Sequence, residues 1–159
     1  MDGLESLLAK LRRDRHAGRR IVFTNGCFDL LHAGHVGCLQ QARDLGDVLV
    51  VAVNSDRSVR RLKGPDRPVN SEEDRMLVLA GLRCVDHVVA FDDDRPDALI
   101  AAIRPEVYVK GGDYAAAALP ERRLVESYGG RVVALSYLPG RSTSEMIGRI
   151  RRDQRSPYV

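Results

Sequence analysis

Apolar residues along the chain form short continuous runs, and these runs are separated by stretches with helical spacing. Continuous apolar runs rich in valine are typical of parallel strands that are covered on both faces. We expect strands at 21–24, 48–53, 87–91, 106–109 and 131–136. Apolar residues that repeat every three or four positions predict helices over 1–18, 35–45, 71–82, 96–103, 119–128 and 142–153, with a helical turn over 56–62.

Local signals mark several helix ends. Ser71 precedes three acidic residues at 72–74, which the helix dipole favours in a first turn. Pro96 suits the start of the next helix, and Gly129-Gly130 ends the helix before the last strand. In the helix that Ser71 begins, the expected apolar face consists of Met76, Leu77, Leu79, Ala80 and Leu82.

The alternation of strands and helices predicts an α/β fold, a Rossmann-like open parallel sheet of about five strands with helices on both faces. The length of 159 residues fits a single domain over 1–159, and the chain has no internal repeat, linker or low-complexity segment. Within that domain we expect an N-terminal helix over 1–18 and a flexible tail at 154–159.

Composition narrows the function classes. The net charge of +3 is too small, and the basic residues are too scattered, to predict nucleic-acid binding. The sequence has no apolar run of about 18 residues that would predict a membrane span, and residues 1–20 lack the apolar core of a signal peptide. Three irregularly spaced cysteines without a CxxC pair predict neither a zinc site nor a disulfide framework. We therefore expect a cytoplasmic protein with reduced thiols and no metal site of its own.

The loop after the first strand, residues 25–34, carries the strongest chemical signal. Ligands of open parallel sheets bind beyond the carboxyl ends of the strands, and this loop leads into His32-Ala33-Gly34-His35 at the start of a helix. Gly34 lets a ligand approach the backbone, and the helix N-terminus offers N–H groups that suit phosphate. We expect both imidazoles to donate hydrogen bonds to a triphosphate. The loop lacks the G-x-G-x-x-G pattern of a dinucleotide-binding turn, which argues against a dehydrogenase.

A second phosphate-type segment follows the last strand. Ser142, Thr143 and Ser144 begin the final helix, where hydroxyl and N–H groups would face the same cleft as the two histidines. Ser142 and Glu145 also have the spacing of a capping box, so a purely structural role stays open. Capping or packing is likewise the alternative for each histidine. Metal ligation by the histidine pair is disfavoured, because no Cys, Asp or His partner lies at a zinc-like spacing.

Two further segments extend this edge of the predicted sheet. Lys63 begins a loop over 63–70, where a mobile lysine would neutralise charge as a transition state forms. Lys110, Gly111, Gly112 and Asp113 follow the fourth strand, and the two glycines would let a flat base approach the backbone. The alternatives are an exposed lysine in the first segment and an ordinary turn in the second.

Together these segments resemble the cytidylyltransferase-like superfamily of nucleotidyltransferases. Within it, the chain is most similar to the D-glycero-D-manno-heptose 1-phosphate adenylyltransferases, in the form without a fused sugar kinase. The His-x-Gly-His segment carries the resemblance to the superfamily. Two segments carry the resemblance to the heptose 1-phosphate adenylyltransferases within that superfamily, Asn25-Gly26-Cys27-Phe28-Asp29 and Val109-Lys110-Gly111-Gly112-Asp113-Tyr114. Further stretches that match these enzymes lie at 53–56, 61–64, 67–70, 74–76 and 141–143.

The resemblance implies transfer of AMP from ATP to a heptose 1-phosphate, giving ADP-heptose and pyrophosphate, with Mg²⁺ bound to the ATP. It also implies a homodimer, and catalytic roles for His32, His35 and Lys63. The nucleotide contacts that it implies come from Asn25, Gly26, Cys27, Phe28, Lys110, Gly111, Asp113, Ser142, Thr143 and Ser144. On the sugar-phosphate side it implies contacts from Asp29, Asp56 and Arg75.

Two other functions stay open at this point. One is a cytidylyltransferase that acts on glycerol phosphate or another small alcohol phosphate, although those relatives tend to have Tyr-Gly-Thr-Phe-Asp where this chain has Asn-Gly-Cys-Phe-Asp. The other is a nucleotide-binding regulatory domain without catalysis, against which His32, His35 and Lys63 argue because binding alone would not need all three. The sequence does not indicate the heptose anomer or the destination of the product.

Overall fold

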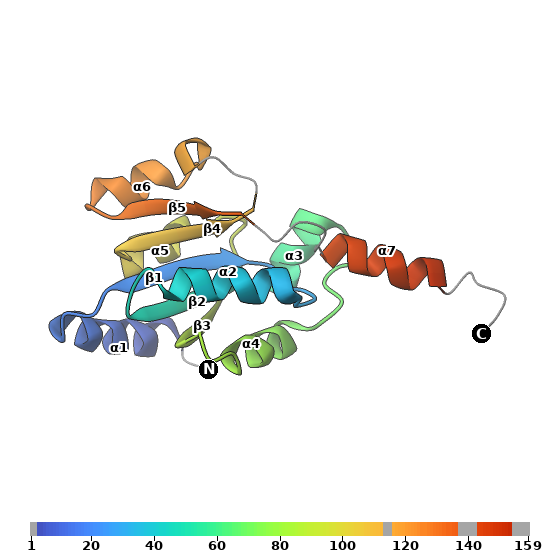
Figure 1. The fold of residues 1–159 in the computed structure, drawn as a ribbon, viewed down its shortest axis with the longest axis horizontal. Coiled ribbons are helices and arrows are strands. Elements are labelled where there is room, and N and C mark those ends of the chain that lie inside the picture. Colours follow the sequence, from blue (N-terminus) through green and yellow to red (C-terminus); the bar gives the residue numbers. More distant parts are fainter. Residues whose placement is uncertain (1–2, 113–115, 137–142, 154–159) are drawn as a thin grey trace.

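Strands and helices alternate along the chain in the computed structural model, which describes residues 3–112, 116–136 and 143–153 (Figure 1). The strands are β1 Ile21–Gly26, β2 Val48–Asn54, β3 His87–Phe91, β4 Val107–Gly111 and β5 Arg131–Leu135. The helices are α1 Leu4–His16, α2 Ala33–Arg43, α3 Asp56–Lys63, α4 Glu72–Ala80, α5 Asp97–Ile103, α6 Arg122–Ser127 and α7 Thr143–Asp153, with a 3-10 turn, η1, at Ala116–Ala118.

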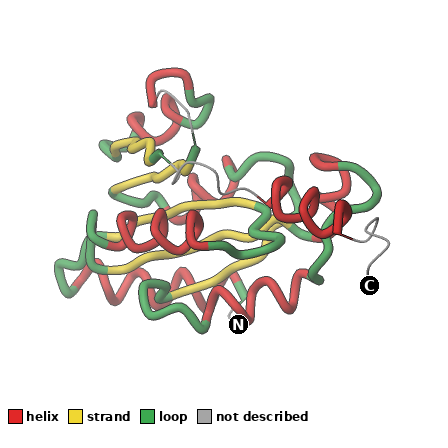
Figure 2. The backbone as a smooth tube through the Cα atoms, turned by 45° about the vertical axis from the view of Figure 1, so that its right-hand side comes forward, coloured by secondary structure: helices red, strands yellow, loops and turns green. Residues whose placement is uncertain are grey.

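The strands form one five-stranded parallel sheet in the order β3-β2-β1-β4-β5 (Figure 2). This arrangement confirms the predicted Rossmann-like α/β fold. The chain builds outward from β1 to β2 and β3 on one side, and then returns to place β4 and β5 on the other. The direction of strand addition therefore reverses between β1 and β4. Such a reversal opens a crevice beyond the carboxyl ends of the two strands, where ligands bind in open α/β sheets.

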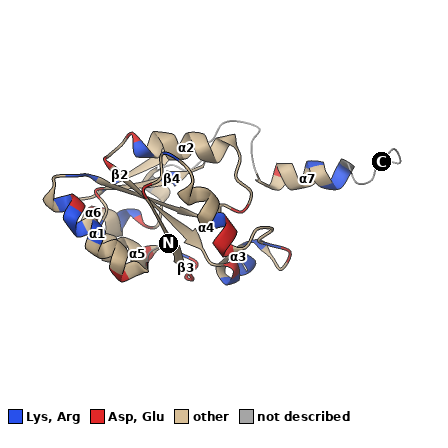
Figure 3. Ribbon diagram, turned by 90° about the horizontal axis from the view of Figure 1, so that it is seen from below, with Lys and Arg blue, Asp and Glu red and all other residues tan. Residues whose placement is uncertain are grey.

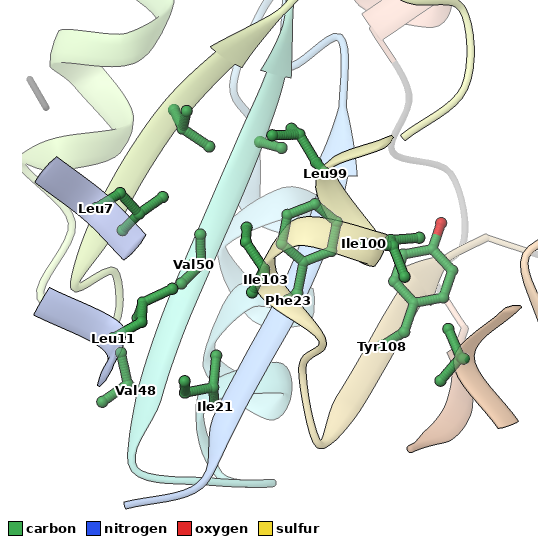
Figure 4. Packing of buried hydrophobic residues seen from close by; sticks show 13 residues of the cluster. Leu7, Leu11, Ile21, Phe23, Val48, Val50, Leu99, Ile100, Ile103 and Tyr108 are labelled. Atoms are coloured by element: carbon green, nitrogen blue, oxygen red, sulfur yellow. The ribbon is translucent and has the colours of Figure 1, made fainter. Parts of the chain in front are cut away.

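One face of the sheet is covered by α1, α5 and α6 (Figure 4). Leu7 and Leu11 of α1 pack on it, and so does Ile100 of α5. Phe23 and Tyr108 lie side by side on the neighbouring strands β1 and β4, with ring centroids 6.0 Å apart, and neither residue has exposed surface. Burial of side chains of this size contributes about 1.5–3 kcal/mol each.

The opposite face is covered by α2 and α4, so the prediction of helices on both faces is also confirmed. Met76 and Leu79 are the buried apolar residues of α4, while Leu77 is 66% exposed. The expected apolar face of this helix was therefore too wide. Arg75, which the hydrophobic pattern did not place inside, is buried instead because its guanidinium bonds to neighbouring loops.

Several element bounds differ from the prediction around the carboxyl edge of the sheet. β1 continues through Asn25 and Gly26, which were expected in a loop, because they pair with Ala52 and Val53 of β2. The helix expected at 35–45 begins two residues earlier, since His32 caps it. Lys63 is the last residue of α3 rather than part of a loop. These shifts place candidate residues on regular elements, which hold them more rigidly than a loop would.

The C-terminal third shows the largest differences in helix length. The helix expected over 119–128 is replaced by η1 and the short helix α6. Helix α7 extends away from the sheet and its covering helices, and basic positions lie toward its C-terminal end (Figure 3). The predicted flexible tail at 154–159 falls outside the described residues. Within the described part of the chain, every helix is too short or too polar to cross a membrane.

Candidate functional site

The loop between β1 and α2 is held in a bent conformation by Phe28. Its φ angle is 47°, in a region that is unusual for a bulky residue. The Phe28 ring is buried and lies 5.5 Å, centroid to centroid, from the ring of His35. A Cβ atom at Gly26 would come within 3.1 Å of the same ring. A side chain at residue 26 would therefore require the Phe28 ring to shift by a few tenths of an ångström. Backbone conformations of this kind tend to occur at functional sites.

His32 and His35 stack on each other at the N-terminus of α2. Their ring centroids are 3.9 Å apart, and the rings are inclined by 29°. Nδ1 of His32 accepts a hydrogen bond from the backbone N–H of Gly34 at 3.1 Å, which caps the helix. In a neutral His32 the ring proton is therefore on Nε2, which can act as a donor. The capping role and the donor role, which the sequence left as alternatives, are compatible in this geometry.

Burial sets the protonation of the histidine pair. Burial first, and then the neighbouring His32, lowers the pKa of His35 to about 4. His35 is therefore a neutral imidazole at physiological pH in the ligand-free protein. It can donate a hydrogen bond to an anion without a positive charge of its own.

Asp29 ties the β1–α2 loop to the segment that follows α3. Its side chain is 1% exposed. One carboxylate oxygen accepts hydrogen bonds from the backbone N–H groups of Val69 and Asn70, and the other bonds to Arg67 Nε at 2.5 Å. The amide of Asn70 donates in turn to the backbone carbonyl of Asp29 at 2.9 Å. Asp29 thus uses both of its oxygens within the protein, so the structure places it in the loop scaffold.

Arg75 performs a similar task from beneath the loop. Its guanidinium has no exposed surface and donates to the backbone carbonyls of Cys27, at 2.5 Å, and Asn70, at 3.1 Å. It also pairs with Asp56 at 2.8 Å. Asp56 and Arg75 are both absent from the lining of the cavity described below. The two side chains bind each other, and the contacts with a sugar phosphate that were expected of them stay a prediction.

A cavity of about 760 Å³ opens at the carboxyl edge of the sheet, within the ~300–1,000 Å³ range of ligand sites. It brings together most of the predicted site residues: Asn25, Gly26, Cys27, Phe28, Asp29, His32, His35, Lys63, Lys110, Gly111, Thr143 and Ser144. Two other predicted residues, Asp113 and Ser142, lie outside the described residues. The segments predicted to face one cleft are therefore gathered around one cavity.

The first turn of α7 reaches the β1–α2 loop. The Thr143 hydroxyl donates a hydrogen bond to the backbone carbonyl of Leu30 at 3.1 Å. This bond joins segments that are 113 residues apart in the sequence. The N-termini of α2 and α7 therefore border the same cavity, and each brings backbone N–H groups and a partial positive charge toward it.

The α3 helix carries Lys63 to the cavity and is clamped to the end of β3. Arg57 forms two hydrogen bonds to the Asp92 carboxylate, and Arg61 pairs with Asp94 at 2.8 Å. The helix ends at Gly64, whose φ of 101° would strain any other residue. Lys63 thus stands at the end of a fixed helix, where its side chain remains the movable part.

Four cavity residues were missed from the sequence: Asn54, Leu62, Arg67 and Asp94. Asn54 had a detectable signal, because it is the polar residue that ends the most apolar strand, at the sheet edge where ligands bind. Arg67 had none, since only its pairing with Asp29 brings it to the cavity.

The cavity lining carries a small excess of positive charge. Lys63, Arg67 and Lys110 line it together with Asp29, which is paired with Arg67, and Asp94, which is paired with Arg61 outside the lining. Burial lowers the pKa of Lys110, and nearby charges modify it to a smaller degree. Burial likewise raises the pKa of the Cys27 thiol, so this cysteine is not an activated nucleophile. Hydrogen-bond donors and cations around an open cavity suit a polyphosphate.

The donor set bears on how Mg²⁺ would be held. Among the described residues there is no group of three or more His, Cys, Asp or Glu that could bind a metal ion. Because both cavity carboxylates are engaged by arginines, they are poorly placed to build a protein cage for the ion. These residues fit a magnesium ion that is held by phosphate oxygens and water, the mode that Mg²⁺ favours with nucleotides.

Comparisons with known proteins agree with this geometry. The model of the cytidylyltransferase-like family matches residues 23–149. The bifunctional protein HldE of Syntrophotalea carbinolica is 56% identical over 146 residues, which cover 92% of this chain and 30% of that protein. The protein of the same name from Hahella chejuensis is 54% identical over 151 residues, which cover 95% of this chain and 32% of that protein. The chain thus spans about a third of the length of these relatives.

Two solved structures share the fold. A lipopolysaccharide core biosynthesis protein from Thermoplasma volcanium superposes with a TM-score of 0.63 at 27% identity, covering 76% of this chain and 98% of that one. A pantoate-beta-alanine ligase from Francisella tularensis, in complex with beta-gamma ATP and beta-alanine, superposes with a TM-score of 0.55 at 16% identity. The match covers 86% of this chain and 67% of that one. The second similarity concerns the fold alone.

Proposed function

Because the chain belongs to the cytidylyltransferase-like family, we propose that it is a nucleotidyltransferase that transfers AMP from ATP to a heptose 1-phosphate, releasing pyrophosphate. The observation that carries the proposal is the stacked pair His32–His35, which stands with the first turn of α7 around one cationic cavity. The choice of acceptor is supported by the resemblance of the segments at 25–29 and 109–114 to heptose 1-phosphate adenylyltransferases.

In the proposed reaction, an oxygen of the sugar phosphate attacks the α phosphorus of ATP in line. A bond forms between that oxygen and the α phosphorus, and the bond from the α phosphorus to the bridging oxygen breaks, so pyrophosphate leaves with the electron pair. The attacking oxygen is already anionic, and no general base is needed. Catalysis then consists of positioning and charge stabilisation.

Each part of the cavity has a task in this scheme. His32 and His35 donate hydrogen bonds to the phosphates, and the backbone of 26–28 lies near the α phosphate. Lys63 neutralises charge on the transferring or incoming phosphate. Thr143 and Ser144, with Ser142, hold the β and γ groups at the N-terminus of α7. Lys110, Gly111 and Asp113 contribute to nucleotide binding. Asp29 and Arg75 act indirectly, by fixing the loop that presents these donors.

We propose that Mg²⁺ enters with ATP, held mainly by phosphate oxygens and water. When bound, the ion neutralises charge on the triphosphate. Its removal with a chelator should abolish turnover, while the thermal stability of the ligand-free protein should stay unchanged, because the described residues hold no metal cluster.

A pyrophosphate-release assay tests the function directly. ATP and CTP are each combined with heptose 1-phosphate and with glycerol phosphate. Discrimination that depends on hydrogen bonds to a base edge is large, so we expect ATP to exceed CTP at least about tenfold in kcat/KM with the heptose acceptor. Equal or better use of CTP would favour a cytidylyltransferase. Release of no pyrophosphate in any combination, with nucleotide still bound, would favour a regulatory domain.

We also propose that the protein is a homodimer and works in the cytoplasm. The dimer is supported by Leu77 and Val78, adjacent residues of α4 that are 66% and 52% exposed and that a second copy would cover. Sedimentation analysis of the protein and of Leu77→Ser tests it, since loss of this apolar contact should shift the population toward monomer. The cytoplasm is supported by Cys27, Cys38 and Cys84, which are all free thiols.

A further inference from the structure

Tyr108 is a buried tyrosine that contacts a residue of the cavity lining, Asn25. Tyr108 lies on β4 with no exposed surface, and its ring packs beside Phe23 in the core (Figure 4). Its hydroxyl group donates a hydrogen bond to Oδ1 of Asn25 at 2.8 Å. The ammonium of Lys110 donates to the same oxygen at 3.4 Å. Asn25 and Lys110 line the cavity, whereas Tyr108 does not.

These contacts determine how the Asn25 amide is turned. An amide side chain has an acceptor end, Oδ1, and a donor end, Nδ2. The Lys110 ammonium can only donate, so it requires the oxygen, whereas the Tyr108 hydroxyl can donate or accept. Rotation of the amide by 180° would place Nδ2 against the ammonium and lose that hydrogen bond, and the Tyr108 hydroxyl would have to change from donor to acceptor. The stable orientation is therefore the one in which Oδ1 faces Tyr108 and Lys110. In this orientation the two N–H groups of Nδ2 can donate to another acceptor.

The hydroxyl group of Tyr108 is not needed to fill the core. A phenylalanine at 108 would occupy the same space beside Phe23, without a polar group to bury. Burying a hydroxyl without a hydrogen bond costs free energy, and the bond that the Tyr108 hydroxyl donates goes to a residue of the cavity wall. The bond thus connects the interior of the sheet to the site, at the reversal point between β1 and β4.

We propose that Tyr108 is a positioning residue that orients Asn25, so that the Asn25 Nδ2 group and the Lys110 ammonium form one donor pair for a phosphate oxygen of the nucleotide. This inference rests on the proposed function in taking a nucleotide as the ligand, and it adds the group that sets the donor pair. Neither donor needs to reorient when the ligand arrives, because the Oδ1 contacts already hold both of them.

The test is Tyr108→Phe, which removes the hydroxyl and keeps the ring. Calorimetry measures the dissociation constants of the magnesium complexes of ATP and CTP, and steady-state assays measure KM for nucleotide and acceptor. We expect nucleotide binding to weaken about tenfold, the size of one lost hydrogen bond in a closed site. KM for the acceptor should not change, whereas a general loosening of the fold would raise both KM values and lower Tm.

Tyr128→Phe is the matched control. The Tyr128 hydroxyl group is buried and has no hydrogen-bond partner among the described residues, and its ring lies 5.3 Å from the Arg104 guanidinium, outside the cavity lining. The same chemical change should leave nucleotide binding unaffected there. A double-mutant cycle completes the test, because Tyr108→Phe should have little further effect once Asn25→Ala has removed the amide.

The outcomes separate the two proposals. If wild-type protein binds nucleotide but Tyr108→Phe binds equally well, or if its effect persists in full in the Asn25→Ala background, the positioning role is refuted. If nucleotide binds without turnover, the proposed function fails while the weaker binding of Tyr108→Phe still supports the positioning role. If wild-type protein binds neither nucleotide, both proposals fail.

Discussion

Replacement of Arg75 by methionine tests whether this buried guanidinium is a scaffold element or a substrate contact. The side chain has no exposed surface, and its loss would leave the carbonyls of Cys27 and Asn70 without these donors and Asp56 without its cation. Hydrogen bonds to charged groups contribute about 1.5–3 kcal/mol each and are not additive, and breaking a buried ion pair costs about 3–5 kcal/mol. Asp56 is partly exposed, so we take about 3–4 kcal/mol as the loss in unfolding free energy.

For a chain of this length, each kcal/mol lowers Tm by about 2–4 °C, so Arg75→Met should lower Tm by roughly 6–16 °C. Differential scanning calorimetry measures this shift, and Arg57→Met provides the control. Arg57 is 73% exposed in its pair with Asp92, and surface pairs contribute about 0–1 kcal/mol. Turnover at a temperature where Arg75→Met is still folded should also fall, because the loop at Cys27 has lost its anchor. A Tm within about 2 °C of wild type together with a raised KM for the sugar phosphate would refute the scaffold role and restore the substrate contact.

Three other perturbations probe the cavity. His32→Ala and His35→Ala should each lower kcat by about two orders of magnitude with the fold retained, while His16→Ala on the exposed surface of α1 should behave as wild type; near-normal turnover of the cavity variants would disprove the mechanism. Lys63→Ala should reduce kcat more than nucleotide affinity if its contact forms mainly in the transition state, and the reverse pattern would identify a ground-state anchor. Burial lowers the pKa of His35 from 6.5 to about 4, so the unfolded chain binds the proton more readily than the folded protein. The contribution of the neutral His35 to the free energy of unfolding is therefore fully present above pH 6.5 and is lost as pH falls toward 4. Thermal melts across this window should show a smaller decline for His35→Gln than for wild type, and an identical decline would contradict the assigned protonation.

Much of the fold could be predicted because it depends on local patterns. The valine-rich run at 48–53 and the run at 87–91 are strands within one residue of the predicted bounds, since continuous apolar runs between helical stretches suit a buried parallel sheet. Ser71 caps α4 as its acidic neighbours indicated. The inward position of Arg75 could not be predicted, because a hydrophobic pattern does not reveal carbonyl groups that approach from other loops.

The site followed a similar division. The His32–His35 segment and the two helix starts were found because residue type and spacing carry their chemistry. The roles of Asp29 and Arg67 depend on a contact between residues 38 positions apart, which spacing does not encode. Lys63 was expected in a loop because Gly64 and Pro65 follow it, but the Ser55 cap and the pairs of Arg57 and Arg61 with the end of β3 extend the helix to it.

The hydrogen bond from Thr143 to Leu30 has a consequence for how the cavity depends on the C-terminal part of the chain. Both histidines and the central strand β1 precede residue 44 in the sequence, but the other wall of the cavity comes from residues 110–112 and 143–144. A chain truncated before residue 143 can still pair β1 with β2, yet it lacks the helix start that contacts the β1–α2 loop. We therefore expect such a truncated chain to keep the histidine pair but to bind nucleotide more weakly than the full sequence.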